Sequence, residues 1–476
     1  MTLIDGWQVV VGLEVHVQLL TDSKLFSPAP TSFGGEPNTN VDVVDAGLPG
    51  VLPVLNTLAV ELALRLGLAL GSTIARRSVF ARKHYFYPDL PKGYQISQFE
   101  QPIIAGGALV VDGRPIRLTR AHLEEDAGKS LHVAGDSTFL DFNRAGTPLL
   151  EVVSEPELCS AEEAATFFRT LRTLVVALGV CDGNLQEGSM RADANVSVRR
   201  PGTALGQRVE LKNINSPRFL ADAIDNEARR QIAEIGNGRA IVQETRLWDA
   251  DRRESRSMRT KEDAHDYRYT PDPDLPPIIV TDEEIERVRA AMPELPEARR
   301  ERYQARGLAS ADAAILSGDP GLARFFDDAV AAHDNPKALA SWTINEVLRV
   351  LNERGLPAEA AAQVLRPSGL ARLVRLIDTG AITGKIGKDV FVVIAADGSD
   401  PEDVVEARGW RVLKDTAAVE RAVAEAISES PGEWQRVLEG KGKVIGYFVG
   451  QVMKKTGGKA DPKDVNRLLE EQRTRK

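Results

Sequence analysis

The spacing of the hydrophobic residues changes once along the chain, close to residues 293–296. Before this point, short stretches alternate between apolar and polar residues and are separated by Gly, Pro and Asn, which is typical of β-strands joined by turns. After it, the chain is rich in Ala, Leu, Arg and Glu with helical spacing. We therefore predict an α+β protein, in which a sheet-rich region precedes a helical one.

A second change of composition divides the helical region. Gly, Ser, Asp and Pro interrupt the helical pattern near residues 397–403, which indicates a linker. The length of 476 residues also favours three domains, at about 150 residues for each. We predict a sheet-rich domain over residues 1–294, a helical domain over 295–402 and a small helical tail domain over 403–476.

The composition excludes several classes of protein. The formal net charge is −9, so any contact with nucleic acid must be local. The two cysteines, Cys159 and Cys181, are too few for a disulfide framework or a four-ligand zinc site, so we expect a reducing compartment and no structural zinc. The sequence has no signal peptide and no run of about 18 apolar residues, and we expect a cytoplasmic protein without membrane contact.

Polar residues share one face of two predicted strands. In residues 11–19, Glu14, His16 and Gln18 alternate with apolar residues. Because alternate residues of a strand point to the same side, the strand has one polar face. In residues 191–199 the polar face consists of Arg191, Asp193, Asn195, Ser197 and Arg199. One interpretation is that both faces meet water, as one face of an antiparallel sheet often does.

Further carboxylates favour a metal site over a solvated sheet. Glu124 and Glu125 are adjacent, Glu151 precedes two valines, and Glu187 precedes Asp193. Oxygen ligands from separate strands, with a single imidazole, suit Mg²⁺ better than zinc. A Mg²⁺ site of this kind indicates phosphate chemistry. The chain has no Walker A, GxGxxG, HExxH or GxSxG motif, so the pattern alone identifies no reaction.

Several long strings in the first domain resemble a single protein family. They are VGLEVHV (11–17), HYFYPD (84–89), PKGYQISQ (91–98), EEDAGKS (124–130), DFNRAGTPLLE (141–151) and EGSMRADAN (187–195). These strings are similar to the B subunit of tRNA-dependent amidotransferases. The similarity extends into the helical region as far as GQVMK (450–454), so it covers essentially the whole chain.

The resemblance implies a fold and a function. The fold is a cradle-shaped domain of mixed or antiparallel strands, followed by a helical domain and a helical tail that contacts tRNA. The function is ATP-dependent amidation of misacylated Glu-tRNA(Gln), Asp-tRNA(Asn) or both. The side-chain carboxylate is phosphorylated, and ammonia from a partner amidase, the A subunit, then replaces the phosphate. A small C subunit holds the other two together, and the cofactors are ATP and Mg²⁺.

The resemblance also assigns roles to individual residues. The implied metal ligands are Glu14, His16, Glu125, Glu151 and Asp193, with Glu124 or Glu187 as further candidates. The implied catalytic residues are Glu125, Lys83, Tyr87 and Thr147, the last three near the route of ammonia. Candidates for contact with phosphate or with the tRNA 3′ end are Arg144, Arg191, Arg199 and Lys212. The alternative is that each of them only forms a surface ion pair. His122 and His132 are interpreted as structural or exposed.

The C-terminal residues reverse the charge of the chain. Residues 439–476 hold ten basic residues against five acidic ones. One interpretation is a solvated pair of terminal helices. The other, which the resemblance favours, is a surface that faces tRNA phosphates, with two Gly-Lys loops that approach the backbone closely. The predicted tRNA-binding residues are Lys441, Lys443, Lys454, Lys455 and Lys459.

Two other functions compete with the amidotransferase. A metal-dependent hydrolase would use the same carboxylates, and a non-catalytic scaffold would bind tRNA for an amidase. ADP release that depends on misacylated tRNA separates the ligase from the hydrolase. Loss of activity on mutation of the polar strand faces separates the ligase from the scaffold.

Overall fold

The computed structural model describes residues 3–132, 137–260, 267–412, 416–439 and 444–474. The chain divides into two compact units, Met1–Leu295 and Pro296–Lys476. The first unit is rich in sheet and the second is helical, which confirms the predicted α+β fold class. Among the helices of the described segments, none combines the length and the apolar character that a membrane span needs.

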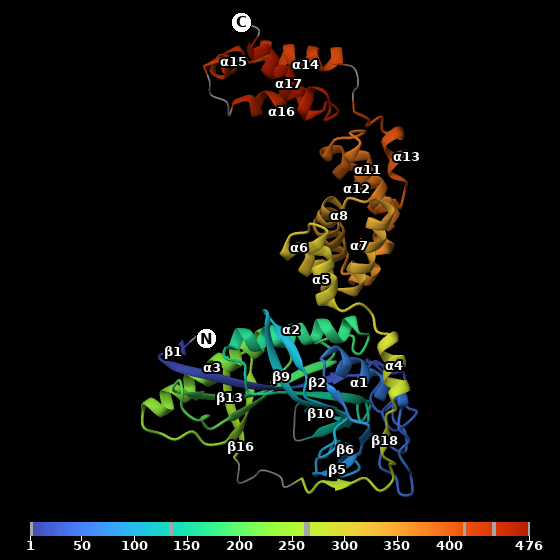
Figure 1. The fold of residues 1–476 in the computed structure, drawn as a ribbon, viewed down its shortest axis with the longest axis vertical. Coiled ribbons are helices and arrows are strands. Elements are labelled where there is room, and N and C mark those ends of the chain that lie inside the picture. The colour runs from blue at the N-terminus through green and yellow to red at the C-terminus, as the bar shows by residue number, and fades with distance from the viewer. Residues whose placement is uncertain (1–2, 133–136, 261–266, 413–415, 440–443, 475–476) are drawn as a thin grey trace. The chain divides into compact units, whose positions relative to one another are not determined.

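One large sheet runs through the first unit (Figure 1). It has eleven strands in the described part of the chain, and neighbours are antiparallel except for the parallel pair β14 and β15. The order along its main path is β16 (Glu254–Thr260), β15 (Glu244–Asp249), β14 (Val209–Ile214), β13 (Met190–Arg199), β2 (Trp7–Gln18), β12 (Pro148–Ser154), β9 (Arg114–Glu125), β7 (Ile104–Ala105) and β3 (Thr73–Ile74). Two further strands lie off this path: β1 (Leu3–Ile4) pairs with β2, and β8 (Ala108–Val111) pairs with β9.

Smaller sheets accompany the large one. The pair β10 (Lys129–His132) and β11 (Thr138–Asp141) forms a hairpin after β9. A second small sheet has the order β17 (Thr270–Pro271), β5 (Ala81–His84) and β6 (Tyr94–Ser97). The third is the pair β18 (Ile278–Ile279) and β4 (Arg77–Ser78).

The apolar side of the central strands is covered by helices. On β2, Val11, Leu13, Val15 and Val17 are fully buried and belong to the core of the first unit. Two helices, α2 (Ala161–Ala177) and α3 (Pro217–Gly236), pack side by side over this face (Figure 1). The unit also contains α1 (Thr57–Ala69) and α4 (Asp282–Ala290). Because side chains alternate along a strand, the polar residues of β2 and β13 point to the opposite face.

The second unit contains two hydrophobic cores. The first involves α5 (Pro296–Ala305), α6 (Ser310–Ser317), α7 (Pro320–Ala332), α8 (Pro336–Trp342), the π-helix η2 (Thr343–Val347), α9 (Leu348–Arg354), the 3₁₀ turn η3 (Ala358–Ala360), α10 (Ala361–Val364), α11 (Pro367–Asp378), α12 (Gly384–Asp397) and α13 (Pro401–Ala407). The second involves α14 (Thr416–Glu429), α15 (Pro431–Leu438), α16 (Ile445–Lys455) and α17 (Pro462–Thr474). Val404, Val405 and Trp410, which the predicted division assigned to the tail, pack with the first core.

Candidate active site

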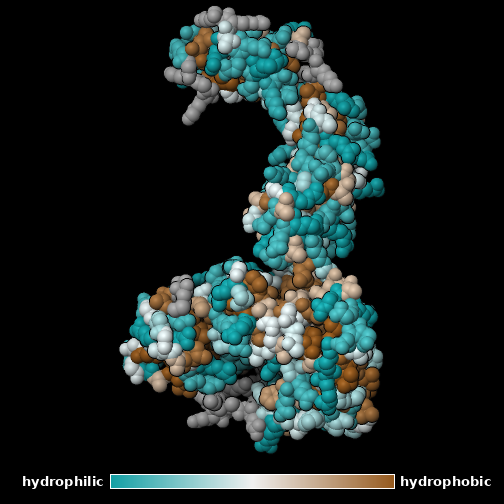
Figure 2. All heavy atoms as spheres, viewed as in Figure 1, coloured by the Kyte–Doolittle hydropathy of each residue, from teal (hydrophilic) through white to brown (hydrophobic). Residues whose placement is uncertain are grey.

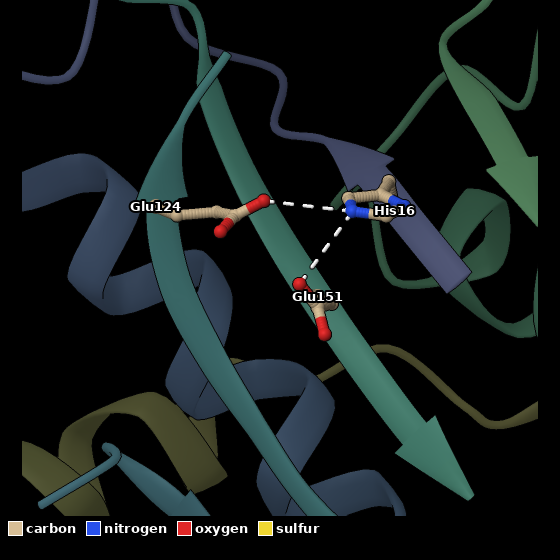
Figure 3. Close-up of side chains that lie close together, drawn as sticks. All are labelled: His16, Glu124 and Glu151. Carbon is tan, nitrogen blue, oxygen red and sulfur yellow. Dashed lines mark ion pairs between the residues drawn. The ribbon is translucent and has the colours of Figure 1, made fainter. Parts of the chain in front are cut away.

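Three neighbouring strands bring acidic and imidazole side chains together on the open face of the large sheet. His16 lies on β2, Glu151 on β12, and His122 and Glu124 on β9. The strand register places Glu151 opposite His16 on one side and opposite His122 on the other. Figure 3 shows the carboxylates of Glu124 and Glu151 pointing toward the His16 ring. The cluster therefore depends on cross-strand register, and its members come from distant parts of the sequence.

Both carboxylates lie close to both imidazoles. His16 Nε2 is 3.6 Å from Glu124 Oε1 and 3.5 Å from Glu151 Oε2. His122 Nε2 is 3.8 Å from Glu124 Oε2 and 3.6 Å from Glu151 Oε2. One ligand atom each from His16, Glu124 and Glu151 lies within 4.8 Å of the other two. This spacing lets a single metal ion bind all three side chains.

A second row of polar side chains lies two residues further along the strands. Glu14 on β2 is opposite Asp193 on β13, and Asn195 Nδ2 donates a hydrogen bond of 2.9 Å to Glu14 Oε1. Lys212 Nζ, on β14, is 2.9 Å from Asp193 Oδ2 and 3.1 Å from Glu210 Oε1. Asp193 is only 8% exposed. The interpretation that these strand faces simply meet water is therefore wrong for this part of the sheet.

Apart from Glu124, the members of the two rows line one cavity of about 370 Å³. Its carboxylates are supplied by Glu14, Glu151, Asp193, Glu210 and Glu244. Its positive charges are supplied by Lys83, Arg120, Arg208 and Lys212. Carboxylates of this kind bind divalent cations, and Arg and Lys side chains bind phosphate oxygens. The cavity thus offers both kinds of group that a metal–nucleotide complex requires.

Burial and neighbouring charges both shift the pKa values of ionisable groups in the cavity. Burial raises the pKa of Glu14, and the carboxylates of Glu151 and Glu210 raise it further. Burial alone would lower the pKa of His16, but the carboxylates of Glu151 and Glu124 raise it above its usual value. Burial alone would raise the pKa of Glu151, yet His122 and His16 hold it well below its usual range. A cation bound by these carboxylates would displace protons from the site.

Lys83, on β5, carries a buried positive charge into this cavity. Its Nζ lies 4.7 Å from the centre of the Tyr267 ring and 5.8 Å from that of Tyr85. Burial would lower the pKa of Lys83, but the carboxylates of Glu124 and Glu151 raise it. The side chain therefore stays charged at neutral pH, as a phosphate-binding group must.

The placement of Glu125 corrects one predicted ligand. Glu125 points to the opposite side of β9 from Glu124 and does not line the cavity. Its carboxylate accepts hydrogen bonds from Lys92 Nζ at 2.6 Å and from the backbone N–H of Ile96 at 2.8 Å. His122 and Glu124 are two residues apart and share a strand face, whereas Glu125 is out of phase with them. In this structure Glu124, and not Glu125, contacts the imidazole of His16.

Three of the four predicted phosphate-binding residues make contacts outside the cavity lining. Arg191 donates to both carboxylate oxygens of Asp126 at 3.0 Å. Arg144 donates to the backbone carbonyls of residues 127 and 128. Arg199 donates to Gln8 and to the carbonyl of residue 203. Of the four, Lys212 alone lines the cavity among the residues described.

Tyr87 and Thr147 differ in their relation to the cavity. Tyr87 is half exposed and lines a neighbouring hollow of about 360 Å³ that it shares with Lys83 and Lys212. Thr147 is buried next to the loop after β9, where its carbonyl accepts from the N–H of Asp126. The structure thus connects Tyr87 with the cavity through Lys83. Thr147 does not line the cavity.

Five charged or imidazole residues of the cavity were not assigned to it from the sequence: Arg120, His122, Arg208, Glu210 and Glu244. Arg120 and His122 precede Glu124 by four and two residues, so strict alternation along this strand would have placed all three on one face. Glu210 and Lys212 are related in the same way on β14. Glu187, named as a further metal candidate, is exposed in the turn before β13. For Arg208, which precedes β14, the sequence carries no comparable signal.

The predicted tRNA-binding lysines are only partly described. Lys441 and Lys443 lie outside the described residues. Lys454 is exposed at the end of α16, and Lys459 is half buried in the following turn. Lys455 Nζ lies 2.6 Å from Glu429 Oε1, so part of its charge is already neutralised within the tail. Of the described lysines, Lys454 is the most open to a partner.

The buried pair of Asp126 and Arg191 predicts sensitivity to acid. Burial alone would raise the pKa of Asp126, but Arg191 and Arg144 lower it from 3.8 to about 2. A carboxyl with a lowered pKa stabilises the fold above its unfolded-state pKa and loses this effect as the pH falls through the folded-state value. We expect Asp126→Asn to lower the free energy of unfolding at pH 7 by about 2 kcal/mol, a difference that shrinks between about pH 4 and pH 2. Urea unfolding across this pH range measures it, and a difference that stays constant contradicts the prediction.

A cavity that combines carboxylates with phosphate-binding cations has the composition of an active site for phosphoryl chemistry. Two family models match the chain: the GatB/GatE catalytic domain over residues 9–286 and the GatB domain over residues 324–472. Three relatives are each named as the B subunit of an aspartyl/glutamyl-tRNA(Asn/Gln) amidotransferase. The relative from Anaeromyxobacter sp. (strain Fw109-5) is 53% identical, that from Variovorax paradoxus (strain S110) 52%, and that from Nitratidesulfovibrio vulgaris (strain DP4) 51%. Each match covers 98% of both chains.

The chain therefore belongs to the family of B subunits of the aspartyl/glutamyl-tRNA(Asn/Gln) amidotransferase. This finding confirms the resemblance seen in the sequence. Membership of the family also implies the use of ATP.

Proposed function

We propose that the cavity on the open sheet face is the site at which this chain amidates misacylated tRNA. As part of an amidotransferase, the chain participates in converting Glu- or Asp-tRNA to Gln- or Asn-tRNA, with glutamine as the amido donor. The observation that carries the assignment is that the cluster of His16, Glu124 and Glu151 adjoins a cavity lined by His16, Glu151 and the cations Lys83 and Lys212.

The chemistry proceeds in two balanced steps. An oxygen of the substrate carboxylate attacks the γ-phosphorus of ATP, and ADP leaves, so that an acyl phosphate forms. Ammonia then attacks the acyl carbon, phosphate leaves, and the nitrogen loses a proton to give the amide. Lys83 and Lys212 neutralise charge on the phosphate oxygens in both steps.

Mg²⁺ fits the donors of this cavity. Burial raises the pKa of Glu14, the carboxylates of Glu151 and Glu210 raise it further, and a divalent cation relieves the repulsion between these carboxylates. Glu124, Glu151 and His16 would hold the ion, with Glu14 and Asp193 beside it. When bound, Mg²⁺ supplies charge neutralisation at the transferring phosphoryl group.

The route of ammonia rests mainly on the resemblance. Lys83 and Tyr87 line the hollow next to the active-site cavity, which supports a place for both along this route. For Thr147 and Glu125 the resemblance alone carries a catalytic role, since neither lines the cavity. Glu125 is paired instead with Lys92.

Exposed apolar side chains support the docking of partner proteins. Val43, Leu48, Leu52 and Val54 lie within one segment and are 50% to 75% exposed. Figure 2 shows hydrophobic residues at several places on the surface of the sheet-rich unit. Exposed apolar surface of this kind commonly marks a protein–protein interface. We assign the partners as the amidase A subunit and the small C subunit that the resemblance implies.

ADP release tests the proposed function. The chain is assembled with its amidase and small-subunit partners, and ADP and amidated tRNA are measured with each misacylated tRNA, with correctly charged tRNA and without tRNA. We expect ADP to form only with Glu-tRNA(Gln) or Asp-tRNA(Asn), in step with amide formation. ADP release that ignores tRNA, or deacylation without ADP, would overturn the proposal in favour of a hydrolase.

The basic tail predicts a salt-sensitive contact with tRNA. Truncation after Val412 removes residues that form their own core, from Val419 to Leu469, so the remaining cores stay complete. We expect tRNA binding to weaken by roughly tenfold or more and its dependence on salt to flatten, because fewer counterions are released. Filter binding of tRNA to the full-length and truncated complexes at several salt concentrations measures both effects. Equal affinities and equal slopes would show that the tail does not bind tRNA.

A further inference from the structure

A short segment near the end of the first unit runs along β5 and lines the active-site cavity. We call this segment, residues 267–274, the strap. Its strand β17 pairs antiparallel with β5, and the backbone N–H of His84 donates a hydrogen bond of 2.9 Å to the carbonyl of Tyr267. Tyr267 and Tyr269 line the active-site cavity, and Tyr267 also lines the hollow next to it. The strap therefore adds aromatic side chains to a cavity whose other lining residues are mostly polar or charged.

One arginine of β5 holds the strap in place. Arg82 Nε lies 2.9 Å from Asp272 Oδ2, and Arg82 Nη2 lies 2.7 Å from Asp274 Oδ2. The guanidinium also lies over the ring of Tyr94, 4.4 Å from its centre. The side chain of Asp272 is fully buried, and hydrogen bonds between an arginine and a carboxylate are strong. Lys83 is the next residue of β5, so its side chain points to the opposite face from Arg82.

The ammonium of Lys83 contacts aromatic rings of this part of the structure. Its Nζ lies 4.7 Å from the centre of the Tyr267 ring and 5.8 Å from that of the Tyr85 ring. Among the described residues, none forms a hydrogen bond or an ion pair with Lys83 Nζ, whereas Lys212 Nζ lies 2.9 Å and 3.1 Å from two carboxylates. A ring face attracts a cation but does not neutralise its charge. The contact therefore fixes the position of the ammonium and leaves its three donors to other groups.

Further aromatic contacts fix the ring of Tyr267. It lies edge-on to Tyr85 on one side and to Tyr269 on another, with centroid distances of 5.9 Å and 6.1 Å. Tyr269 is in turn stacked on Phe99, which follows β6, at a centroid distance of 4.1 Å. Aromatic pairs at these distances add to the stability that burial alone supplies. The position of the Tyr267 ring thus depends on the strap, on β5 and on the residues after β6.

We infer that the strap is a positioning element for the active site, in which Tyr267 fixes the ammonium of Lys83 and Arg82 anchors the strap. The inference rests on the proposed function, which places Lys83 at the phosphate oxygens. Tyr267 and Arg82 act through Lys83 and are positioning residues. The charge on these oxygens changes as the phosphoryl group is transferred, so a correctly placed ammonium stabilises the transition state more than the bound substrates. Loss of the ring should therefore reduce kcat more than it raises either KM.

Steady-state kinetics of the assembled complex tests the role of Tyr267. We expect Tyr267→Leu to lower kcat by about tenfold, an effect of the size of a cation–π contact with a desolvated ammonium. The KM for ATP and the KM for misacylated tRNA should each change less than threefold. Tyr267→Phe should keep kcat within about twofold of wild type, because it retains the ring face. The matched control is Phe139→Leu, which removes an aromatic ring that is 59% exposed on β11 and should leave kcat unchanged.

Urea unfolding of each variant gives the folded fraction, and rates are compared per folded complex. Equal kcat values for Tyr267→Leu and wild type would overturn the inference. Equal losses in Tyr267→Leu and Tyr267→Phe would also overturn it, since the hydroxyl and not the ring face would then matter. A raised KM for misacylated tRNA at unchanged kcat would overturn it as well, because the strap would then bind tRNA. In all three cases the wild-type complex would still form ADP and amide, whereas absence of tRNA-dependent ADP from that complex would refute the proposed function itself.

Hydrogen exchange tests the anchor. Arg82→Lys keeps the positive charge but loses the planar fork that reaches both carboxylates of the strap. We expect the amide of Asp272, which donates to the carbonyl of residue 80, to exchange faster in this variant. We also expect kcat to fall while both KM values stay within threefold, as in Tyr267→Leu. Faster exchange with an unchanged kcat would show that the strap does not position Lys83.

Discussion

Replacing Glu151 with glutamine should lower the amidation rate of the assembled enzyme by roughly 100-fold or more, the loss expected when several kcal/mol of charge stabilisation disappear. Glutamine keeps the volume of the side chain but removes the charge that faces both His16 and His122. The same oxygens are among those that would hold Mg²⁺. The fold should survive, because glutamine keeps the volume of the side chain and His16, whose pKa the carboxylates raise against the effect of burial, can release its proton once the charge is gone.

The measurement compares ADP release and amide formation by the wild-type and Glu151→Gln complexes over a range of Mg²⁺ concentrations. Glu254→Gln is the matched control, because Glu254 lies on β16 and its ion pair with Arg256 is half exposed. The control should retain full activity. A rate for Glu151→Gln within threefold of wild type, at saturating Mg²⁺ and ATP, would show that the cluster is not part of the active site.

The sequence predicted the strands that carry the site better than it predicted the site itself. Alternation in residues 11–19 correctly placed Glu14 and His16 on one face of β2, because that face is polar and the other is buried. The cross-strand row of the site depends instead on which strands are neighbours and in what register they pair. This row consists of Arg191, His16, Glu151 and His122. Register is set by long-range pairing and by packing under α2 and α3, and no local pattern records it.

For the neighbours Glu124 and Glu125, the ligand implied by the family resemblance differs from the residue that the strand directs toward the cluster. The resemblance favoured Glu125, but two adjacent residues of a strand point to opposite faces. Glu124 faces the cluster, whereas Glu125 is buried beside Lys92, just before β6. The boundary predicted between the helical domain and the tail also differs from the packing in the structure. Gly, Ser and Pro near residue 400 looked like a linker, yet Val404 and Val405 on the next helix pack back onto the preceding core.

The glutamates at positions 151 and 125 differ in what happens to their partners when their charge is removed. Glu151 faces His16, whose pKa it raises against the effect of burial, so loss of the carboxylate is answered by loss of a proton. Glu125 faces the ammonium of Lys92, whose side chain is 8% exposed. Burial raises the pKa of Glu125, while Lys92 and the N–H of Ile96 counteract that effect. The same substitution should therefore reduce activity at position 151 and stability at position 125.

We expect Glu125→Gln to lower the free energy of unfolding of the first unit by about 3–5 kcal/mol, because it leaves the buried ammonium of Lys92 without its counter-charge. The double variant Lys92→Met/Glu125→Leu should recover most of this loss, since an apolar pair of similar volume needs no charge compensation. Urea unfolding of the full chain measures both, with hydrogen exchange in β6 and β9 assigning the transition to the first unit.

Glu162→Gln is the matched control for this experiment. Glu162 forms an ion pair with Arg169 on α2, but its side chain is mostly exposed, and such pairs contribute at most about 1 kcal/mol. If Glu125→Gln is no more destabilising than Glu162→Gln, the ion pair with Lys92 does not hold β6 against β9. If the double variant is as unstable as Glu125→Gln, the loss comes from packing at position 125 and not from the stranded charge. Recovery in the double variant together with a low amidation rate would separate a catalytic role of Glu125 from its structural one, because the fold would then be intact while the carboxylate is absent.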